Sequence, residues 1–190
     1  MKNKKLYNML IAAMLSAIGF IIPLFSPVKI LLEPASFTLA SHVAIYIAMF
    51  ISPGVALSVA AGTTLGFLLA GFPPVVVVRA ASHLVFAFVG SYILKKNSKI
   101  IDQTASMIIF ALLISLLHAT TEVLVVMPFY FGGGLTSGYY ARGFLTSVIL
   151  LVGLGTVVHS LIDFAIARVV WKPLRKTISG RYQEKMEKTS

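Results

Sequence analysis

Long apolar runs, separated by short polar or turn-forming segments, dominate this chain. The separating segments include Ser52-Pro53-Gly54, Gly71-Phe72-Pro73-Pro74 and the polar stretch Lys95–Gln103, whose residues are typical of turns and loops. A helix needs ~20 residues to cross a bilayer, so a chain of this length has room for six spans. The predicted spans are Tyr7–Phe25, Phe37–Ile51, Val55–Leu69, Val75–Leu94, Ala105–Val126 and Phe144–Val170. The pattern predicts an all-α membrane protein: one six-helix membrane domain over residues 1–190.

The first apolar run follows a positively charged start, as the core of a signal peptide does. The run continues to about Phe25, and no convincing small-residue cleavage site ends it. The small residues Ala12, Ala13 and Ala17 keep the cleaved alternative open. We interpret the run as a retained first span.

Composition supports the membrane assignment. The 190 residues are 58% hydrophobic and 12% charged, and the mean hydropathy is +0.93. These values lie far from those of an ordinary soluble domain, and the six spans leave no room for a second, soluble domain. The chain has no cysteine, which excludes disulfides, thiolate catalysis and thiolate metal sites.

The net charge of +10 is distributed as in a membrane protein. Of the 16 lysines and arginines, three precede the first span, three follow the fourth, and seven lie from Arg168 onward. With six spans, all of these fall on one side, which the positive-inside rule makes cytoplasmic. Both termini are therefore predicted to be cytoplasmic, with residues 171–190 as a basic tail that touches lipid headgroups. This distribution argues against nucleic-acid binding.

Ionisable residues recur four positions apart inside the predicted spans. The pairs are Arg79 with His83, His118 with Glu122, and His159 with Asp163. A spacing of four places both members on one face of a helix. Titratable groups are costly in lipid, so they turn inward, find partners and mark sites.

The predicted topology assigns depths to these pairs. The first two come to similar depths in the outer half of the membrane. His159 lies ~22 Å along the sixth span at the helical rise per residue. We therefore expect His159 and Asp163 to lie in the inner half, apart from the other pairs, as a structural or conformational pair.

Arg79 presents a planar, permanently charged fork that suits the carboxylate of a small anion. The alternatives are a structural ion pair with Glu122 or a side chain that reaches the nearby interface. His83 and His118 are candidates to hydrogen-bond a ligand, or to lock their neighbours. His42, near Thr38 and Ser41, is a further candidate for the same cavity, or a packing histidine.

Other chemistries find little support. No two histidines share a helix at ligand spacing, so we expect no metal site and no cofactor. The sequence lacks G-x-x-x-x-G-K-[ST], H-E-x-x-H and G-x-S-x-G, so no ATPase, metalloprotease or serine-hydrolase motif is present. No residue stands out as a nucleophile, and we expect no enzymatic activity.

The segment Phe129–Arg142 is rich in glycine and aromatic residues. Aromatic rings beside glycines suit a lid that closes on a flat ligand ring. Tyr139 and Tyr140 are the candidates for stacking on such a ring. An ordinary aromatic belt at the membrane interface explains the segment equally well.

The combination of features resembles the substrate-binding S components of energy-coupling factor (ECF) vitamin transporters. About 190 residues, six spans, a basic tail and Ala13-x-x-x-Ala17 on the first span carry this resemblance. In that family, an alanine-x-x-x-alanine motif packs on the transmembrane coupling protein. The resemblance implies that Ala13 and Ala17 make this contact. It also implies a ligand pocket in the outer half of the membrane.

Within the family, three segments are most similar to the niacin-specific S components. They are Ser36-Phe37-Thr38-Leu39-Ala40-Ser41-His42, Gly62-Thr63-Thr64-Leu65-Gly66-Phe67 and Arg79-Ala80-Ala81-Ser82-His83. The resemblance implies high-affinity binding of niacin, docking on a coupling protein with two ATPase subunits, and release inside after toppling. S components for another small vitamin or precursor, and a stand-alone ion-coupled transporter, remain alternatives.

Overall fold

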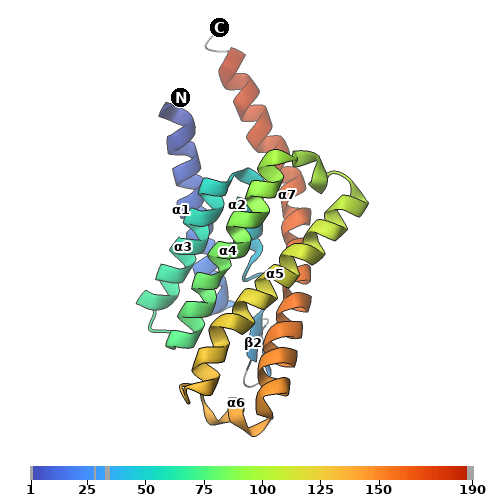
Figure 1. Cartoon of the computed structure of the whole chain (residues 1–190). Coiled ribbons are helices and arrows are strands. Elements are labelled where there is room, and N and C mark those ends of the chain that lie inside the picture. Colours follow the sequence, from blue (N-terminus) through green and yellow to red (C-terminus); the bar gives the residue numbers. More distant parts are fainter. Residues whose placement is uncertain (1, 28, 33–34, 188–190) are drawn as a thin grey trace.

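The fold is a bundle of helices whose longest members run along a common direction (Figure 1). The computed structural model describes residues 2–27, 29–32 and 35–187. Four helices in these ranges are long and apolar enough to cross a membrane, within Lys5–Phe25, Pro74–Lys96, Thr104–Phe131 and Leu145–Lys176. The structure therefore agrees with an all-α membrane protein. Glu33 and Pro34 of the predicted first loop, and the last three residues of the tail, lie outside the described residues.

Helix α1 (Lys2–Phe25) is followed by a short antiparallel hairpin of β1 (Lys29–Leu32) and β2 (Ala35–Thr38). Helices α2 (Val43–Ile51), α3 (Pro53–Leu69) and α4 (Pro74–Lys96) follow, with Pro at or near the first position of α3 and α4. Proline is well tolerated there because that N–H has no helical partner. The Ser52 hydroxyl accepts from the Val55 N–H and caps α3.

The prediction of one helix over Phe37–Ile51 is wrong in its first part. Strand β2 occupies the chain to Thr38, and α2 begins only at Val43. Seven of the nine residues of α2 are buried, and the helix contacts α1, α3, α4 and α7. Surrounded in this way, α2 is a central helix of the bundle, which explains why its sequence is apolar on every face.

The second half of the chain contains α5 (Thr104–Phe131), α6 (Ser137–Ala141) and α7 (Gly155–Glu187). A 3-10 turn, η1 (Ser98–Ile101), precedes α5, and a π-helical segment, η2 (Leu145–Leu154), leads into α7. The predicted loop Phe129–Arg142 is thus partly helical, since α5 extends to Phe131 and α6 lies within it.

The start of α1, the end of α4 and the end of α7 lie at one end of the bundle, and α6 lies at the other (Figure 1). The three lysine- and arginine-rich segments belong to the first of these ends. This arrangement agrees with the sidedness that the charge pattern predicts. The number of complete spans and the orientation of the termini stay predictions.

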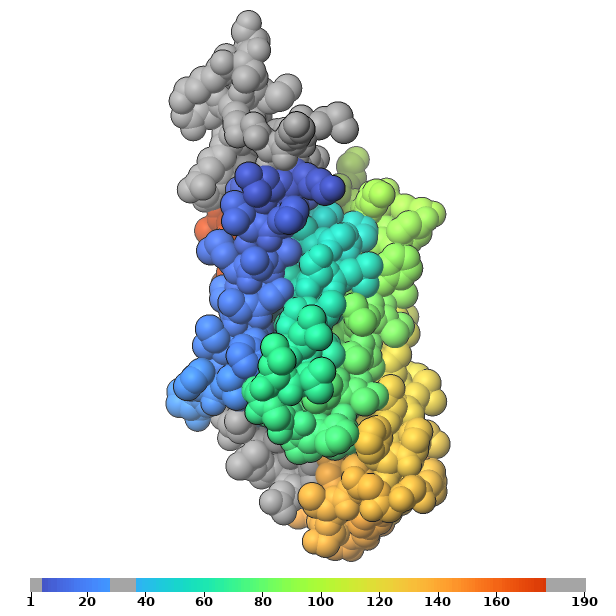
Figure 2. Space-filling view, turned by 90° about the vertical axis from the view of Figure 1, so that its left-hand side faces the viewer, coloured from blue at the N-terminus to red at the C-terminus, as the bar shows by residue number. Residues whose placement is uncertain are grey.

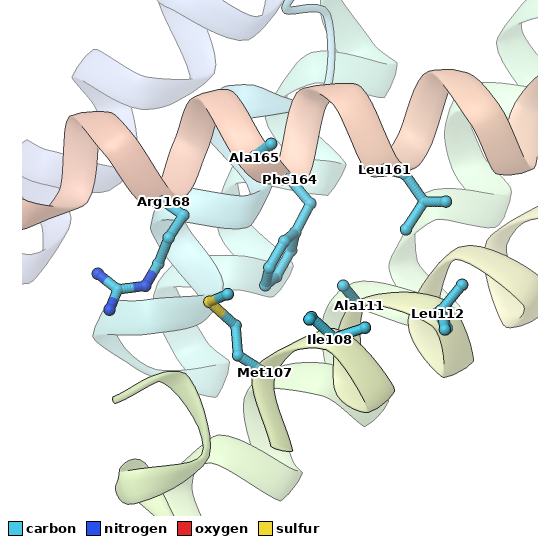
Figure 3. A pocket seen from close by; sticks show the side chains of 8 residues that line it. All are labelled: Met107, Ile108, Ala111, Leu112, Leu161, Phe164, Ala165 and Arg168. Atoms are coloured by element: carbon cyan, nitrogen blue, oxygen red, sulfur yellow. The ribbon is translucent and has the colours of Figure 1, made fainter. Parts of the chain in front are cut away.

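An apolar groove of about 370 Å³ lies between α5 and α7, apart from all predicted site residues. Met107, Ile108, Ala111 and Leu112 line it from α5, and Leu161, Phe164, Ala165 and Arg168 line it from α7. The Phe164 ring points across toward α5, and Arg168 marks one end (Figure 3). The lining is almost wholly apolar, and Arg168 is its one charged side chain among the described residues.

Candidate functional site

His42, directly before α2, lies at the centre of a cluster of four histidines. The ring centroids of His83 and His118 each lie 4.7 Å from that of His42, and the His159 centroid lies 5.0 Å away. These residues come from α4, α5 and α7, and all four are buried. The tertiary structure thus gathers every histidine of the chain at one place.

Glu122 on α5 is the first of two carboxylates in this cluster. Its Oε2 accepts hydrogen bonds from Nη2 of Arg79 at 2.8 Å and from the Thr156 hydroxyl at 2.7 Å. Its Oε1 lies 3.3 Å from Nε2 of His83 and 3.5 Å from Nε2 of His118. A buried carboxylate needs such partners because it has lost its hydration.

Arg79 forms the ion pair with Glu122 that the sequence offered as one alternative. Its side chain is 13% exposed and its charged end is directed at Glu122, so it does not reach out to the interface. Its Nε is buried and has no hydrogen-bond partner within the described ranges. The guanidinium is therefore paired with one carboxylate and retains an unused donor.

Asp163 on α7 is the second carboxylate, and it holds the chain just before α2. Its Oδ1 accepts from the Ala40 N–H at 2.8 Å, and its Oδ2 accepts from the His42 N–H at 2.9 Å. Oδ2 also lies 3.1 Å from Nδ1 of His42 and 3.3 Å from Nε2 of His159. Ala40 has a φ of 68°, a left-handed backbone that is strained for a residue with a side chain.

The prediction that His159 and Asp163 lie apart from the other pairs is wrong. Ser41 Oγ lies 3.0 Å from Nε2 of His159, and His42 contacts Asp163 as well as the rings of His83 and His118. The depth estimate failed because it treated the second and sixth spans as straight, full-length α-helices. The second is a strand, a turn and a short helix, and the sixth begins as a π-helix.

Two polar residues of α7 in the cluster, Ser160 and Thr156, were not singled out from the sequence. Ser160 hydrogen-bonds the Tyr46 hydroxyl and lies 3.2 Å from Nδ1 of His118. Thr156 donates to Glu122. Thr156, His159, Ser160 and Asp163 follow the i, i+3, i+4, i+7 spacing of one helical face, which is the signal that could have found them.

The two tyrosines of the predicted lid lie in different surroundings. Tyr139 is buried and packs in a small cluster with Val126, Val148 and Val152. Burial raises the pKa of its phenol above the usual value, and the charge of Arg79 opposes that rise. Tyr140 is 36% exposed and contacts the backbone of Phe129 and Leu135. Of the two tyrosines, only Tyr139 is buried, and its phenol is close enough to Arg79 to be affected by the charge of that residue.

Ala13 and Ala17 are exposed on α1, among exposed apolar neighbours such as Met14. The opposite side of α1 packs closely on α3, and the two helices lie side by side in Figure 2. A Cβ added at Gly66 of α3 would come within 2.5 Å of the Phe20 ring, so glycine permits this approach. The face with Ala13 and Ala17 is left uncovered in the single chain.

The cluster also contains a set of atoms that could hold a metal ion. One candidate ligand atom from each of His42, His83, His118 and Glu122 lies within 4.8 Å of the others. The argument against a metal site was that no two histidines share a helix at ligand spacing. That argument does not hold, because the ligand set is assembled from three elements of the fold.

Comparisons with known proteins match the chain to a curated transporter. The niacin transporter NiaX of Lactococcus lactis subsp. cremoris (strain MG1363) is 44% identical over 166 residues, covering 87% of this chain and 73% of that protein. No family model and no solved structure matches the chain. An identity of this size over most of both chains places them in one family.

Proposed function

Since this chain belongs to the niacin-type S components of energy-coupling factor transporters, we propose that it binds niacin in the membrane and delivers it to the cytoplasm. The binding site is the cluster around His42, and the ligand is nicotinate or its amide. Niacin is a flat pyridine ring with one carboxyl or amide group. Its recognition needs a partner for that group, a partner for the ring nitrogen and an apolar or aromatic surface.

The observation that carries this proposal is the state of Arg79. The guanidinium is buried beside Glu122, yet its Nε has no hydrogen-bond partner in the parts of the chain that the structure describes. A guanidinium offers five donors, so Arg79 can keep Glu122 and still bind a ligand carboxylate. A buried donor without a partner costs free energy, which an incoming acceptor recovers.

The neighbouring residues supply the other contacts. His83 or His118 meets the pyridine nitrogen, and His42 lies between them. Glu122 orients both imidazoles and balances Arg79. Tyr139, or the more exposed Tyr140 of the same short helix, stacks on the ring once α6 closes. His159 and Asp163 position His42 and do not touch the ligand.

Delivery requires partners. We propose six spans with both termini cytoplasmic, because the lysine- and arginine-rich segments share one end of the bundle. Ala13 and Ala17 on the exposed face of α1 contact the ECF transmembrane coupling protein. Small residues allow the close approach that such packing needs. Two ATPase subunits bound to that protein supply ATP hydrolysis, for which this chain has no motif.

Calorimetry on the purified chain in detergent tests the binding step. We expect one nicotinate per chain, bound without a sodium or proton gradient. Other small vitamins serve as competitors, and one that displaces nicotinate at lower concentration would reassign the substrate. If a folded, monodisperse sample binds neither nicotinate nor nicotinamide, the proposal fails. Uptake into liposomes that contain this chain alone would instead favour a stand-alone transporter.

A further inference from the structure

One ligand atom from each of three imidazoles and one carboxylate in the cluster lies within 4.8 Å of the others, close enough to share a metal ion. Nε2 of His83 and Nε2 of His118 lie 3.3 Å and 3.5 Å from Oε1 of Glu122. Tetrahedral ligands bound at ~2.0–2.1 Å from a zinc ion are separated by ~3.3 Å. We propose that His42, His83, His118 and Glu122 bind a divalent transition metal of the zinc class.

The His118 ring is oriented to offer one nitrogen to a metal ion. Nε2 of His118 is fully buried and has no hydrogen-bond partner in the described part of the chain, although it is directed at Glu122. Its Nδ1 contacts Ser160 at 3.2 Å, which fixes the orientation of the ring. A buried nitrogen held in place without a partner points to a ligand that is not part of the chain.

His42 completes the set through its second nitrogen. Its Nδ1 faces Oδ2 of Asp163 at 3.1 Å, which leaves Nε2 for the metal. A carboxylate behind a ligating imidazole is the usual outer partner in metal sites, where it fixes the tautomer and raises basicity. Asp163 is itself held by the Ala40 and His42 N–H groups, so it acts as this outer partner and not as a ligand.

The metal also changes the net charge of the cluster, which matters for an anionic vitamin. This step rests on the proposed function. Arg79 is the one guanidinium against two buried carboxylates, Glu122 and Asp163, in the cluster as described. With uncharged imidazoles, the cluster carries one net negative charge, which offsets part of the attraction between Arg79 and a ligand carboxylate. A divalent ion reverses this balance to one positive charge. With the metal bound, Nδ1 of His83, which has no hydrogen-bond partner in the described part of the chain, is left for the pyridine nitrogen. Metal and nicotinate therefore bind cooperatively, whereas neutral nicotinamide gains less.

Cobalt(II) is the probe for the metal, because its visible absorption reports coordination. Full-length protein without a histidine tag is treated with chelator and titrated with Co²⁺ in detergent. We expect intense visible bands that saturate at one Co²⁺ per chain and disappear when Zn²⁺ displaces the cobalt. His118→Gln and Glu122→Gln should each weaken Co²⁺ binding by more than the ~10–100-fold typical of outer-partner changes. Thermal unfolding and elution volume check that the variants fold.

Asp102→Asn is the control, since Asp102 forms an exposed ion pair with Arg175 and is no member of the cluster. It should retain the cobalt bands. Bands that survive in all three variants would mean binding elsewhere on the chain and would overturn the site. The absence of cobalt bands in folded wild-type protein would also overturn the site.

Calorimetry with and without Zn²⁺ separates this site from the proposed function. We expect Zn²⁺ to raise nicotinate affinity within the ~5–150-fold range of typical couplings, and nicotinamide affinity by less. Nicotinate binding without cobalt bands would overturn the metal site and leave the proposed function standing. Cobalt bands without binding of nicotinate or nicotinamide would support the metal site and overturn the proposed function.

Discussion

Nδ1 of His42 lies 3.1 Å from Oδ2 of Asp163, so His42 links this carboxylate to the two histidines that face Glu122. On one side Asp163 holds the backbone at Ala40 and His42, while on the other the His42 ring meets His83 and His118. The turn before α2 is therefore fixed by α7, and it presents one histidine to α4 and α5. A perturbation of α7 should reach the candidate site through this contact, and also through Thr156 and Ser160, which contact Glu122 and His118 directly.

Asp163→Asn tests that connection. The substitution replaces the carboxylate that accepts hydrogen bonds from two backbone N–H groups and faces the His42 ring. We expect a loss of about 1–3 kcal/mol in the free energy of unfolding. Niacin affinity should fall as well, although Asp163 does not touch the ligand. Thermal unfolding in detergent and calorimetry measure the two effects.

Asp102→Asn is the control for that experiment. Asp102 pairs with Arg175 in an ion pair in which both side chains are more than 40% exposed. Exposed pairs contribute little, so the unfolding free energy should change by about 0.5 kcal/mol or less. Equal losses in the two variants would mean that Asp163 has no special structural role.

Arg79→Ala tests the ligand anchor. We expect nicotinate binding to weaken by about 2–5 kcal/mol, because the substitution leaves the ligand carboxylate without its charged partner in a buried site. Nicotinamide, which carries no charge, should lose less. The measurement is calorimetry with both ligands, and an unchanged nicotinate affinity would remove Arg79 from the site.

The two adjacent tyrosines should differ. Tyr139 is buried beside Val126 and Val148, so Tyr139→Ala should cost about 3–5 kcal/mol of unfolding free energy, as other buried aromatic truncations do. Tyr140→Ala, at a more exposed position, should cost clearly less. Tyr139→Phe keeps the packing and isolates the hydroxyl. A loss of niacin affinity in Tyr140→Ala, with unchanged affinity in folded Tyr139→Ala, would assign the stacking role to Tyr140.

Ala13→Trp separates partner binding from vitamin binding. The bulky ring on the exposed face of α1 should block a close helix contact, so co-purification with the ECF coupling protein and uptake should fall. Niacin binding by the isolated chain should stay the same. Leu113→Trp, at an exposed position of α5, is the control for a bulky substitution on an apolar surface. Normal uptake with Ala13→Trp would argue against this interface.

By itself the sequence determined the membrane class, the positions of the four long helices and the ionisable residues that lie in pairs along them. Apolar length, lysine and arginine placement and i, i+4 spacing are local properties, and each can be read along the chain. The pairs His118/Glu122 and His159/Asp163 are indeed close on their helices. The family resemblance was readable in the same way, from short segments that match.

Only the tertiary structure decided which of these residues share a site. His42 lies at the end of an irregular segment that apolar patterning read as helix, and its position depends on a strained Ala40 and on Asp163 from the far end of the chain. Helix rotation, the π-helical segment and the short α2 set the relative depths, and none of these follows from spacing within one helix. Contacts between helices depend on packing, which spacing along the chain does not give. The sequence therefore indicated the histidines as candidates, and only the fold placed them together.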